Sequence, residues 1–380
     1  MKISAYAPIN SLGYGIHSYN LLKALMNRGH KIALFPPFGR VEEGFVATAE
    51  WMLNRAEATN DDIGLMIFHE EFLRQFSGRK RVGFPVFELS EFNDIALAGM
   101  KSCDKILQPS HWGKSILLSR GISNVGVVPE GYNHKTFFPD RSDSQAIGMM
   151  QFRINFIHIG KMEKRKSTED ILMAFTRAIT GEKKPTLLMM HVLNPFVRGW
   201  EMEFKTLAEN LGWRSEGEQS SVYGVKAIRF TKEKSILDVP LAKYNSEHDL
   251  ARLYNFFHFG IWASRAEGWN LPLLECCASG VPSFATPIGG QSEYVDINKW
   301  PDEFLFDHLD TEMANDQRFF FGDRGPWWKP SVDQMTEKLK VVLANPEIHY
   351  THARKAILEQ VAGFTWENSA IAFEKEMEGL

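Results

Sequence analysis

The stretch FGIWASRAEGWNLPLLECCASGVPSFATPIGGQSEYV, residues 259–295, contains one complete unit of an α/β fold. An apolar strand is followed by a short loop, a helix that ends at Gly280, and a second apolar strand before a Gly-Gly turn. Glu267 lies in the loop, and Glu275 lies about one helical turn after Leu271. Because such sheets bind ligands beyond the carboxyl ends of their strands, both carboxylates are candidate binding groups.

The same alternation of strands and helices extends along the rest of the chain. Apolar strand segments in the first half are KISAYAP, HKIALFP, IGLMIFH, RVGFPVF, DKILQPS and NVGVVPEG. Residues 137–151 are polar and typical of a linker, and the alternation then restarts with FRINFIHIG, PTLLMMHV, IRFTK, FGIWAS and SFATPIG. We therefore expect an α/β protein of two doubly wound, Rossmann-like domains, residues 1–145 and 150–360, that face a cleft.

Composition narrows the class of protein. A length of 380 residues suits two domains, and a net charge of −4 supplies no basic field for nucleic acid or membrane. The three cysteines, Cys103, Cys276 and Cys277, form neither a disulfide framework nor metal-site spacing, which favours a reducing, cytoplasmic setting. The sequence shows no apolar targeting segment and no run of about 18 apolar residues. Peripheral membrane contact stays open, since it needs only a surface patch.

Two further loops join a strand to a helix and suit an anion. Gly13 and Gly15 follow the first strand, so their backbone N–H groups can approach an anion at a helix N-terminus, although a tight turn explains them equally well. In the second domain, Lys161 and Lys166 lie between a strand and the next helix, together with Lys164 and Arg165. Cations at that place suit a diphosphate.

Five segments in order resemble the GT-B-fold, GT4-type retaining glycosyltransferases (glycosyltransferase group 1). The segments are VVPEGYNHKTFFP, HIGKMEKRKS, SRAEGWNLPLLECCASGVP, GGQSEYV and FTWENSAIAFEKEM, and the resemblance runs over most of the chain. The resemblance implies an N-terminal acceptor domain and a C-terminal domain for a nucleotide-sugar donor. It also implies that a helix in residues 361–380 crosses back to the first domain.

The resemblance assigns roles to the candidate residues. Glu275 is expected to accept hydrogen bonds from the ribose of the donor, and Glu267 to face the transferred sugar as a catalytic group. His69, after an apolar strand, matches a cleft histidine of the family and is the second catalytic candidate; Glu88 has weaker support. Donor-binding residues are Gly13, Gly15, Lys161, Lys166, Gly268, Trp269, Asn270, Leu271 and Glu275.

The implied activity is transfer of a hexose-type sugar from a nucleotide-diphosphate donor, such as a UDP- or GDP-sugar. We expect no cofactor, because the nucleotide sugar is a substrate. We also expect no metal, because the chain has no D-x-D motif and cations and N–H dipoles can stabilise the leaving diphosphate. Front-face attack and a covalent intermediate remain open as routes to retention.

This sequence departs from the family pattern at several positions. Lys161 replaces the arginine of the family's phosphate loop, and Ser167 replaces the glycine that follows its lysine. Asn270 stands where a small residue is usual, and HVLNPF, residues 191–196, replaces a glycine-rich loop that helps frame the nucleotide. The identity of the base is therefore not predicted.

Several alternatives remain open. The acceptor is a glycan, a lipid or another hydroxyl compound, and a nucleic acid is not excluded; the basic segment RQFSGRKR offers one contact for an anionic acceptor or a membrane surface. An epimerase-like enzyme without acceptor and a non-catalytic nucleotide-sugar-binding protein share these features. A NAD-dependent dehydrogenase is disfavoured, because ALFPPFGR does not end the second strand with an acidic residue.

Overall fold

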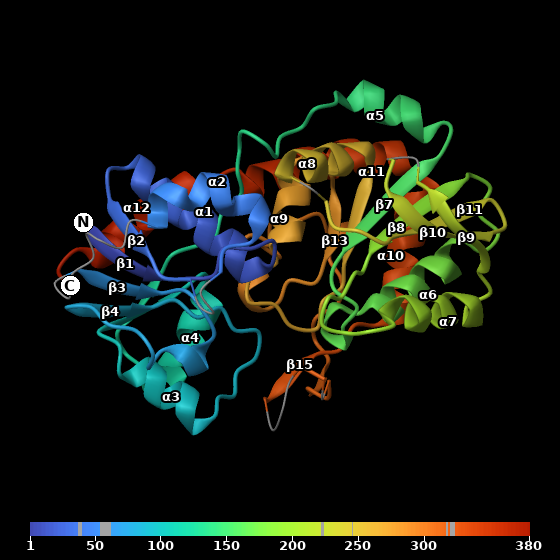
Figure 1. The fold of residues 1–380 in the computed structure, drawn as a ribbon. Helices are drawn as coiled ribbons and strands as arrows, with labels where there is room; N and C mark the ends of the chain where they lie inside the picture. The colour runs from blue at the N-terminus through green and yellow to red at the C-terminus, as the bar shows by residue number, and fades with distance from the viewer. Residues whose placement is uncertain (37–39, 54–61, 222–223, 245, 317, 320–323) are drawn as a thin grey trace.

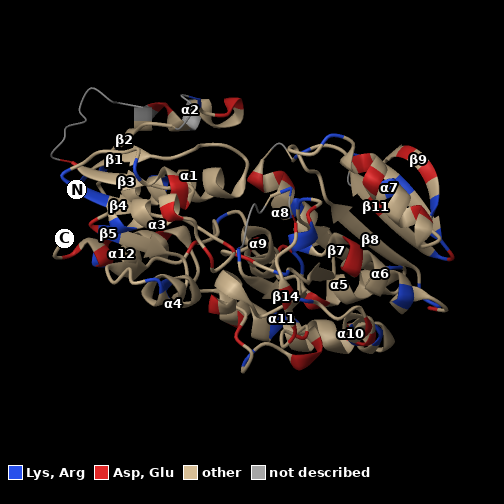
Figure 2. Cartoon of the chain, turned by 90° about the horizontal axis from the view of Figure 1, so that it is seen from below, with Lys and Arg blue, Asp and Glu red and all other residues tan. Residues whose placement is uncertain are grey.

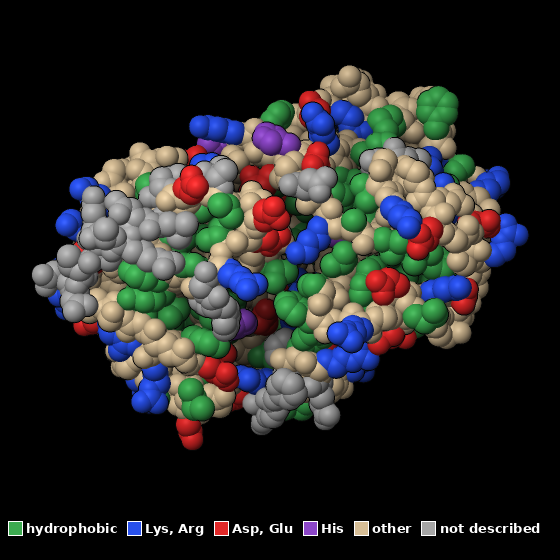
Figure 3. Space-filling model, in the orientation of Figure 1, with side chains coloured by type: hydrophobic (Ala, Val, Ile, Leu, Met, Phe, Trp, Pro, Cys, Tyr) green, Lys and Arg blue, Asp and Glu red, His purple; other side chains and the backbone are tan. Residues whose placement is uncertain are grey.

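The structure is a computed structural model of residues 1–380 that describes the chain except for residues 37–39, 54–61, 222–223, 245, 317 and 320–323. Two sheets lie side by side, each flanked by helices (Figure 1). A space-filling view shows a hollow between the two halves, with charged and histidine side chains at its edge (Figure 3). The expected arrangement of two doubly wound domains facing a cleft is confirmed.

The first sheet has six strands in the order β2-β1-β3-β4-β5-β6, and every neighbouring pair is parallel. Each strand matches an expected segment: β1 (Lys2–Tyr6), β2 (Lys31–Leu34), β3 (Ile63–Met66), β4 (Lys80–Gly83), β5 (Lys105–Gln108) and β6 (Val125–Val127). The helices are α1 (Gly13–Asn27), α2 (Val46–Ala49), α3 (Asp94–Lys101) and α4 (His111–Ser119). Apolar strands covered by helices favour this all-parallel arrangement.

The second sheet has the order β13-β12-β7-β8-β11-β10-β9. Its strands are β7 (Ile154–Ile159), β8 (Thr186–His191), β9 (Arg214–Ser220), β10 (Lys226–Lys232), β11 (Ser235–Pro240), β12 (Phe259–Trp262) and β13 (Ser283–Ala285). The main helices around it are α6 (Thr168–Ile179), α7 (Trp200–Asn210), α8 (Glu247–Phe256), α9 (Leu271–Ala278), α10 (Val332–Ala344) and α11 (Pro346–Val361). Strands β7 and β12 are parallel neighbours, so the loops that follow them meet at the carboxyl ends of the strands.

One edge of this sheet differs from the expected strand–helix alternation. Strand β10 pairs antiparallel with both β9 and β11. The connection from β10 to β11 consists only of Glu233 and Lys234, and Glu233 has a φ of +51°. So short a connection permits a hairpin but not a parallel crossover. The polar sequence of β9, RSEGEQS, has no apolar alternation by which a strand could have been predicted.

The expected linker also contains regular structure. Helix α5 (Asp143–Met150) begins with a capping box, in which the Ser142 hydroxyl accepts from the Gln145 amide and the Gln145 side chain accepts from Ser142. Burial of Ala146 and Met150 holds the helix against the second domain. The linker interpretation was therefore incomplete, and the Ser-x-x-Gln pattern was the available signal.

The chain ends beside its beginning. Helix α12 (Trp366–Met377) packs along α1 of the first domain, and Figure 1 shows both termini at that side. Glu374 bonds to Arg28 and His30, and the Glu376 carboxylate lies 2.7 Å from the Lys105 ammonium. The C-terminal helix is thus tied to the first domain by charge as well as by packing.

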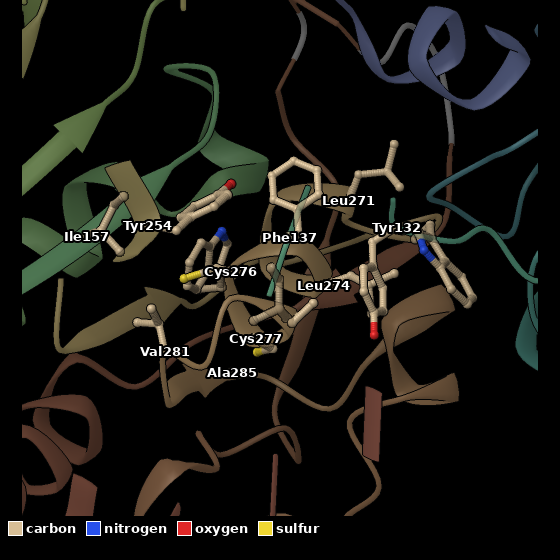
Figure 4. Packing of buried hydrophobic residues seen from close by; sticks show 14 of the residues in the cluster. Tyr132, Phe137, Ile157, Tyr254, Leu271, Leu274, Cys276, Cys277, Val281 and Ala285 are labelled. Carbon is tan, nitrogen blue, oxygen red and sulfur yellow. The ribbon is translucent and has the colours of Figure 1, made fainter. Parts of the chain in front are cut away.

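Helix α9, which follows the opening stretch, is almost wholly buried. Leu271, Leu274, Cys276 and Cys277 pack among side chains from several other segments, as Figure 4 shows. Tyr132 and Phe137, from the connection between the two sheets, belong to the same cluster, as do Tyr254, Ile157, Val281 and Ala285. All three cysteines are free and buried. This packing fixes the helix that carries Glu275.

Candidate active site

The loops after β7 and β12 form the centre of the candidate site. We call residues 160–167 the cationic loop and residues 263–270 the glutamate loop. They follow neighbouring parallel strands and end at the N-termini of α6 and α9. Helix N-termini present free N–H groups and a partial positive charge. The two loops therefore bring cations, N–H groups and Glu267 to the same end of the sheet.

Glu267 is the centre of a buried ion-pair network. Only 3% of the residue is exposed, and its carboxylate oxygens lie 2.5 Å from Lys166 Nζ and 3.0 Å from Arg165 Nη1. The Ser264 hydroxyl donates a further hydrogen bond at 2.6 Å. Burial raises the pKa of Glu267, but the two neighbouring cations outweigh that effect and hold its pKa below the ordinary value. Glu267 is thus an ionised carboxylate bound by protein groups.

Arg165 links this network to the first domain, and it was not among the predicted site residues. Its guanidinium also lies 3.2 Å from Glu163 and 3.7 Å from Glu88, which belongs to the loop after β4. Burial would lower the pKa of Arg165, yet the surrounding carboxylates raise it above its usual value. The four basic residues of the loop were visible in the sequence, but nothing there distinguished the buried Arg165 from the exposed Lys164.

The pKa of Lys166 shifts in the opposite direction from that of Arg165. Its pKa is lowered because desolvation outweighs the attraction of Glu267. The next residue, Ser167, has a φ of +55°, a conformation that glycine adopts without strain. That conformation explains in physical terms why a glycine is usual at this position in the family it resembles.

Unsatisfied polar atoms surround the end of the cationic loop. The hydroxyls of Ser167 and Thr168 are buried and have no hydrogen-bond partner among the described residues, and the same holds for Nε2 of His158. The other ring nitrogen of His158 donates to the Ile261 carbonyl, and burial lowers the pKa of this histidine to about 4, so the ring is neutral. Buried polar atoms of this kind usually have a partner, which points to a polar ligand here.

Lys161 lies at the outer end of the same loop, away from Glu267. Its ammonium lies 2.8 Å from Glu163 and above the rings of Phe196 and Phe319, at 5.2 and 5.9 Å from their centroids. Within the described part of the chain, Lys161 is connected to the Glu267 network through Glu163, which also pairs with Arg165.

Gly268 serves a close approach between the domains. A Cβ atom there would lie 2.6 Å from Val86 Cγ1 and 2.9 Å from the Phe87 carbonyl oxygen, both in the first domain. The amide of Gly290 donates to the Glu267 carbonyl at 2.7 Å, so the Gly-Gly turn packs backbone against backbone on the glutamate loop. Only glycines permit these contacts.

The residues after Gly268 shape the start of α9. Asn270 occupies the position before the first residue of the helix with a φ of +78°, which asparagine tolerates better than most residues, and its side-chain amide donates to Gln291 at 2.9 Å. The Tyr294 hydroxyl donates to the carbonyls of Trp269 and Asn270. Leu271 begins the helix and is buried. This segment holds the N-terminus of α9 beside the cationic loop.

Glu275 lies in a different environment from Glu267. It is 7% exposed, and burial, followed by the nearby charges of Glu247 and Glu130, raises its pKa well above the ordinary value. Among the described residues, no group donates a hydrogen bond to its carboxylate. Asn133 and Asn20 donate to Glu247, and Glu130 lies 3.2 Å from the His17 ring. The two glutamates of the opening stretch thus mark a cation-rich and an acid-rich end of the site.

The raised pKa of Glu275 predicts how protein stability depends on pH. Between the unfolded and the raised folded pKa, the unfolded chain releases this proton first, so stability falls as pH rises through that window. Each unit by which the pKa is raised is worth about 1.4 kcal/mol. Glu275→Gln should therefore gain unfolding free energy relative to wild type between pH 5 and pH 8, measured by urea denaturation. The same difference at both pH values would contradict a raised pKa.

The first domain contributes an aromatic side to the cleft. The Tyr14 hydroxyl donates to the Val86 carbonyl at 2.9 Å and accepts from the Val86 amide at 2.8 Å. Its ring contacts that of His69 at 4.8 Å, and His69 is exposed. Partial burial raises the pKa of Glu70, the next residue. His69 therefore lies beside the glycine turn of α1, as part of the first domain and not of the Glu267 network.

The glycines around Tyr14 differ from each other. A Cβ atom at Gly15 would lie 2.3 Å from the Asn10 carbonyl oxygen, so local packing requires glycine there. Gly13 begins α1 and faces open space. The tight-turn interpretation thus accounts for Gly15, whereas Gly13 keeps its predicted freedom to approach a ligand.

Two of the basic side chains in the segment RQFSGRKR bind groups within the first domain. Arg81 donates to the carbonyls of Ser102 and Leu73, and its guanidinium lies over the Phe76 ring. Lys80 lies 3.6 Å from Asp104. Acidic and basic residues are interspersed over both domains in Figure 2.

Among the described helices, none has the length and apolar character needed to cross a bilayer. The described residues also contain no metal-binding group of three or more His, Cys, Asp or Glu.

Comparison with solved structures identifies the class of fold. The sequence matches no protein-family model and no curated protein. The structure is similar to sucrose-phosphate synthase from Thermosynechococcus elongatus, with a TM-score of 0.66, 14% identity and coverage of 99% of this chain and 98% of that one. It is also similar to HepE of Anabaena, solved with UDP and glucose, with a TM-score of 0.64, 13% identity and complete coverage of both chains.

A third similar structure is trehalose-6-phosphate from E. coli bound with UDP-2-fluoro glucose. Its TM-score is 0.65 at 9% identity, and the alignment covers 100% of this chain and 99% of that one. The chain therefore has the GT-B fold of glycosyltransferases, as the sequence motifs implied. At these identities the similarity establishes the fold, and the activity has to be argued from the site.

Proposed function

We propose that this chain is a retaining glycosyltransferase that moves a hexose-type sugar from a nucleotide-diphosphate donor to a hydroxyl group of an acceptor. The observation that carries the proposal is the buried network of Glu267, Lys166 and Arg165 between the N-termini of α6 and α9. A protein rarely buries two cations and a carboxylate unless they are paired and serve a site.

The cationic loop suits the diphosphate. The four cations of the cationic loop, Lys161, Lys164, Arg165 and Lys166, outnumber the three carboxylates that pair with them, those of Glu163, Glu267 and Glu88. The unpaired hydroxyls of Ser167 and Thr168 lie at the start of α6, where N–H groups also favour an anion. As the glycosidic bond breaks, negative charge grows on the leaving diphosphate, and fixed cations and dipoles stabilise it.

The acid-rich end suits the nucleoside. A buried carboxylate without hydrogen-bond donors is costly, and the vicinal hydroxyls of a ribose would supply two donors to Glu275. The structures of HepE with UDP and glucose and of the E. coli protein with UDP-2-fluoro glucose make UDP-glucose the first donor to test, and GDP-sugars the second.

The transferred sugar would lie between Glu267 and the first domain. Hydrogen bonds from Lys166, Arg165 and Ser264 fix the Glu267 carboxylate in place, and its negative charge would lie beside the reacting centre. An oxocarbenium-like transition state benefits from such a charge. His69 and Glu88 would border the acceptor, for which a glycan, a lipid or another hydroxyl compound remains the prediction.

A donor screen tests the proposal. UDP-glucose, GDP-mannose or their nucleoside diphosphates should raise the melting temperature of the wild-type protein if they bind. A ligand at a hundredfold excess over its Kd adds about 2.7 kcal/mol to the free energy of unfolding. Calorimetry should then show weaker binding to Glu275→Gln but unchanged binding to Glu209→Gln, a control on the exposed face of α7. Absence of binding by every nucleotide would refute the proposal, and sugar turnover without an acceptor would favour an epimerase-like enzyme.

Activity should not require a divalent metal. The cationic loop supplies the charge that a metal would otherwise bring to the diphosphate. With the donor found by the screen, transfer or donor hydrolysis should retain most of its rate in excess EDTA. A loss of activity that Mg²⁺ or Mn²⁺ restores would show that these cations do not suffice.

A further inference from the structure

A hairpin arm extends from the second domain toward the first. We define the arm as residues 307–329, of which 317 and 320–323 lie outside the described residues. Its two strands, β14 (Thr311–Met313) and β15 (Pro326–Trp328), are antiparallel, and Figure 1 shows β15 between the two domains. The arm therefore lies at the boundary between the two domains.

The arm is docked on the first domain. The Arg324 carbonyl accepts from the Glu91 amide at 3.3 Å, and its guanidinium lies 3.9 Å from Glu70 and 3.8 Å from Glu71. A Cβ atom at Gly325 would lie 2.8 Å from the Ser90 hydroxyl, so Gly325 packs tightly against the side chains of this loop. Buried Trp327 packs with Leu89 of the first domain and Ala266 of the glutamate loop.

The same arm holds the cationic loop. Asp316 accepts from the Lys164 amide at 3.2 Å, and Asn315 accepts from the Lys164 ammonium at 2.6 Å. Near the glutamate loop, Arg265 bonds to Glu312 at 2.6 Å, and its carbonyl accepts from the Trp328 amide at 2.9 Å. Lys164 precedes Arg165, and Arg265 is two residues before Glu267, so the arm is attached directly to the proposed diphosphate site.

We propose that the arm couples the proposed diphosphate site to the acceptor side of the cleft, and that Arg324 is the positioning residue of this coupling. The proposal rests on the proposed function. A ligand that orders the cationic loop also orders the arm through Asp316 and Asn315, and the arm then fixes residues 69–71 and 88–91. Because such coupling is reciprocal, an acceptor on these loops strengthens nucleotide binding in turn.

Arg324 suits this role because it faces two carboxylates at the edge of the candidate acceptor site. Glu70 follows His69, and Glu91 is in the same loop as Glu88, whose carboxylate lies 3.7 Å from Arg165. Removing the guanidinium leaves Glu70 and Glu71 without this cation and frees the arm from loop 69–71. A purely structural support would affect stability without making the loops sensitive to nucleotide.

Hydrogen–deuterium exchange tests the coupling in the full chain. Wild type, Arg324→Ala, Arg324→Lys and Arg318→Ala are compared alone and with saturating UDP or GDP. Arg318 is the matched control, because it lies on the same arm but pairs with Glu203 of α7. Without nucleotide, Arg324→Ala should exchange residues 69–73 roughly fivefold faster than wild type, because Glu70 and Glu71 lose a partly buried ion pair. Arg318→Ala should exchange like wild type.

The response to nucleotide decides the proposal. UDP or GDP should slow exchange of residues 69–73 in wild type and Arg318→Ala, but not in Arg324→Ala, and Arg324→Lys should recover part of the response. Equal protection in wild type and Arg324→Ala would overturn the coupling while leaving the proposed function intact. If neither nucleotide protects residues 160–168 in wild type, the proposed function and this inference both fail. Should Arg324→Ala unfold, the graded response of Arg324→Lys gives the same decision.

Discussion

Glu267→Gln is expected to lower both the stability and the turnover of this protein. Glutamine keeps the size of the side chain but removes the charge that balances Lys166 and Arg165, two cations that are almost completely buried. Removing one partner of a buried ion pair typically costs 3–5 kcal/mol; we expect about 3 kcal/mol here, because Arg165 keeps Glu163. Turnover falls as well, since the charge beside the transferred sugar is lost.

Urea denaturation and donor turnover measure the two effects separately. Glu203→Gln is the control: Glu203 pairs with Arg318 at the surface, so its loss should change the unfolding free energy by less than about 0.5 kcal/mol. A Glu267→Gln variant as stable as wild type, but slow in turnover, would contradict a stabilising role and favour direct contact with the sugar. Wild-type stability and wild-type turnover together would remove Glu267 from the site.

Lys166→Ala is expected to weaken binding of the nucleoside diphosphate by roughly 1.5–3 kcal/mol, about tenfold to more than a hundredfold. Its ammonium is buried at the start of α6 and lies 2.5 Å from Glu267, so a diphosphate oxygen would replace or share that contact. The loss is that of a charge-assisted hydrogen bond in a site shielded from water. Calorimetric titration with UDP and GDP measures the effect.

Two further variants make the Lys166 result specific. Lys166→Arg keeps the charge and should bind more tightly than Lys166→Ala, whereas Lys205→Ala, on the exposed face of α7, should bind like wild type. Because Lys166→Ala also leaves Glu267 with one cation fewer, its folding is checked by thermal unfolding before titration. A folded Lys166→Ala protein with wild-type affinity would show that the diphosphate lies elsewhere.

Much of the fold could be predicted from sequence because it depends on local patterns. Six apolar strand segments of the first half became the six parallel strands β1–β6, and the unit at residues 259–295 became β12, α9 and β13. The antiparallel edge was not predicted, because β9 is polar and its place depends on pairing with β10 rather than on an apolar face. Helix α5 was missed because a single capping box was the only local signal.

The candidate site likewise has features that could be predicted from sequence and features that could not. The sequence by itself determined the loops: glycines at close approaches, cations before α6, and a glutamate on either side of the turn into α9. The spacing of residues along the sequence specifies which of them lie in the same loop, because the ends of strands and helices follow from local backbone geometry. It also placed Glu267 and Glu275 at one end of the sheet, where parallel strands bring their following loops together.

Only the tertiary structure decided what those residues face. Glu267 is surrounded by Lys166 and Arg165, whereas Glu275 lies among Glu130 and Glu247, so two carboxylates of similar sequence context differ in the direction of their pKa shifts. Their partners come from segments up to 145 residues away, counted from Glu130 to Glu275. Burial and charge depend on such distant contacts, which is why Arg165, Glu130, Glu247 and the docking of Arg324 could not be predicted from local pattern.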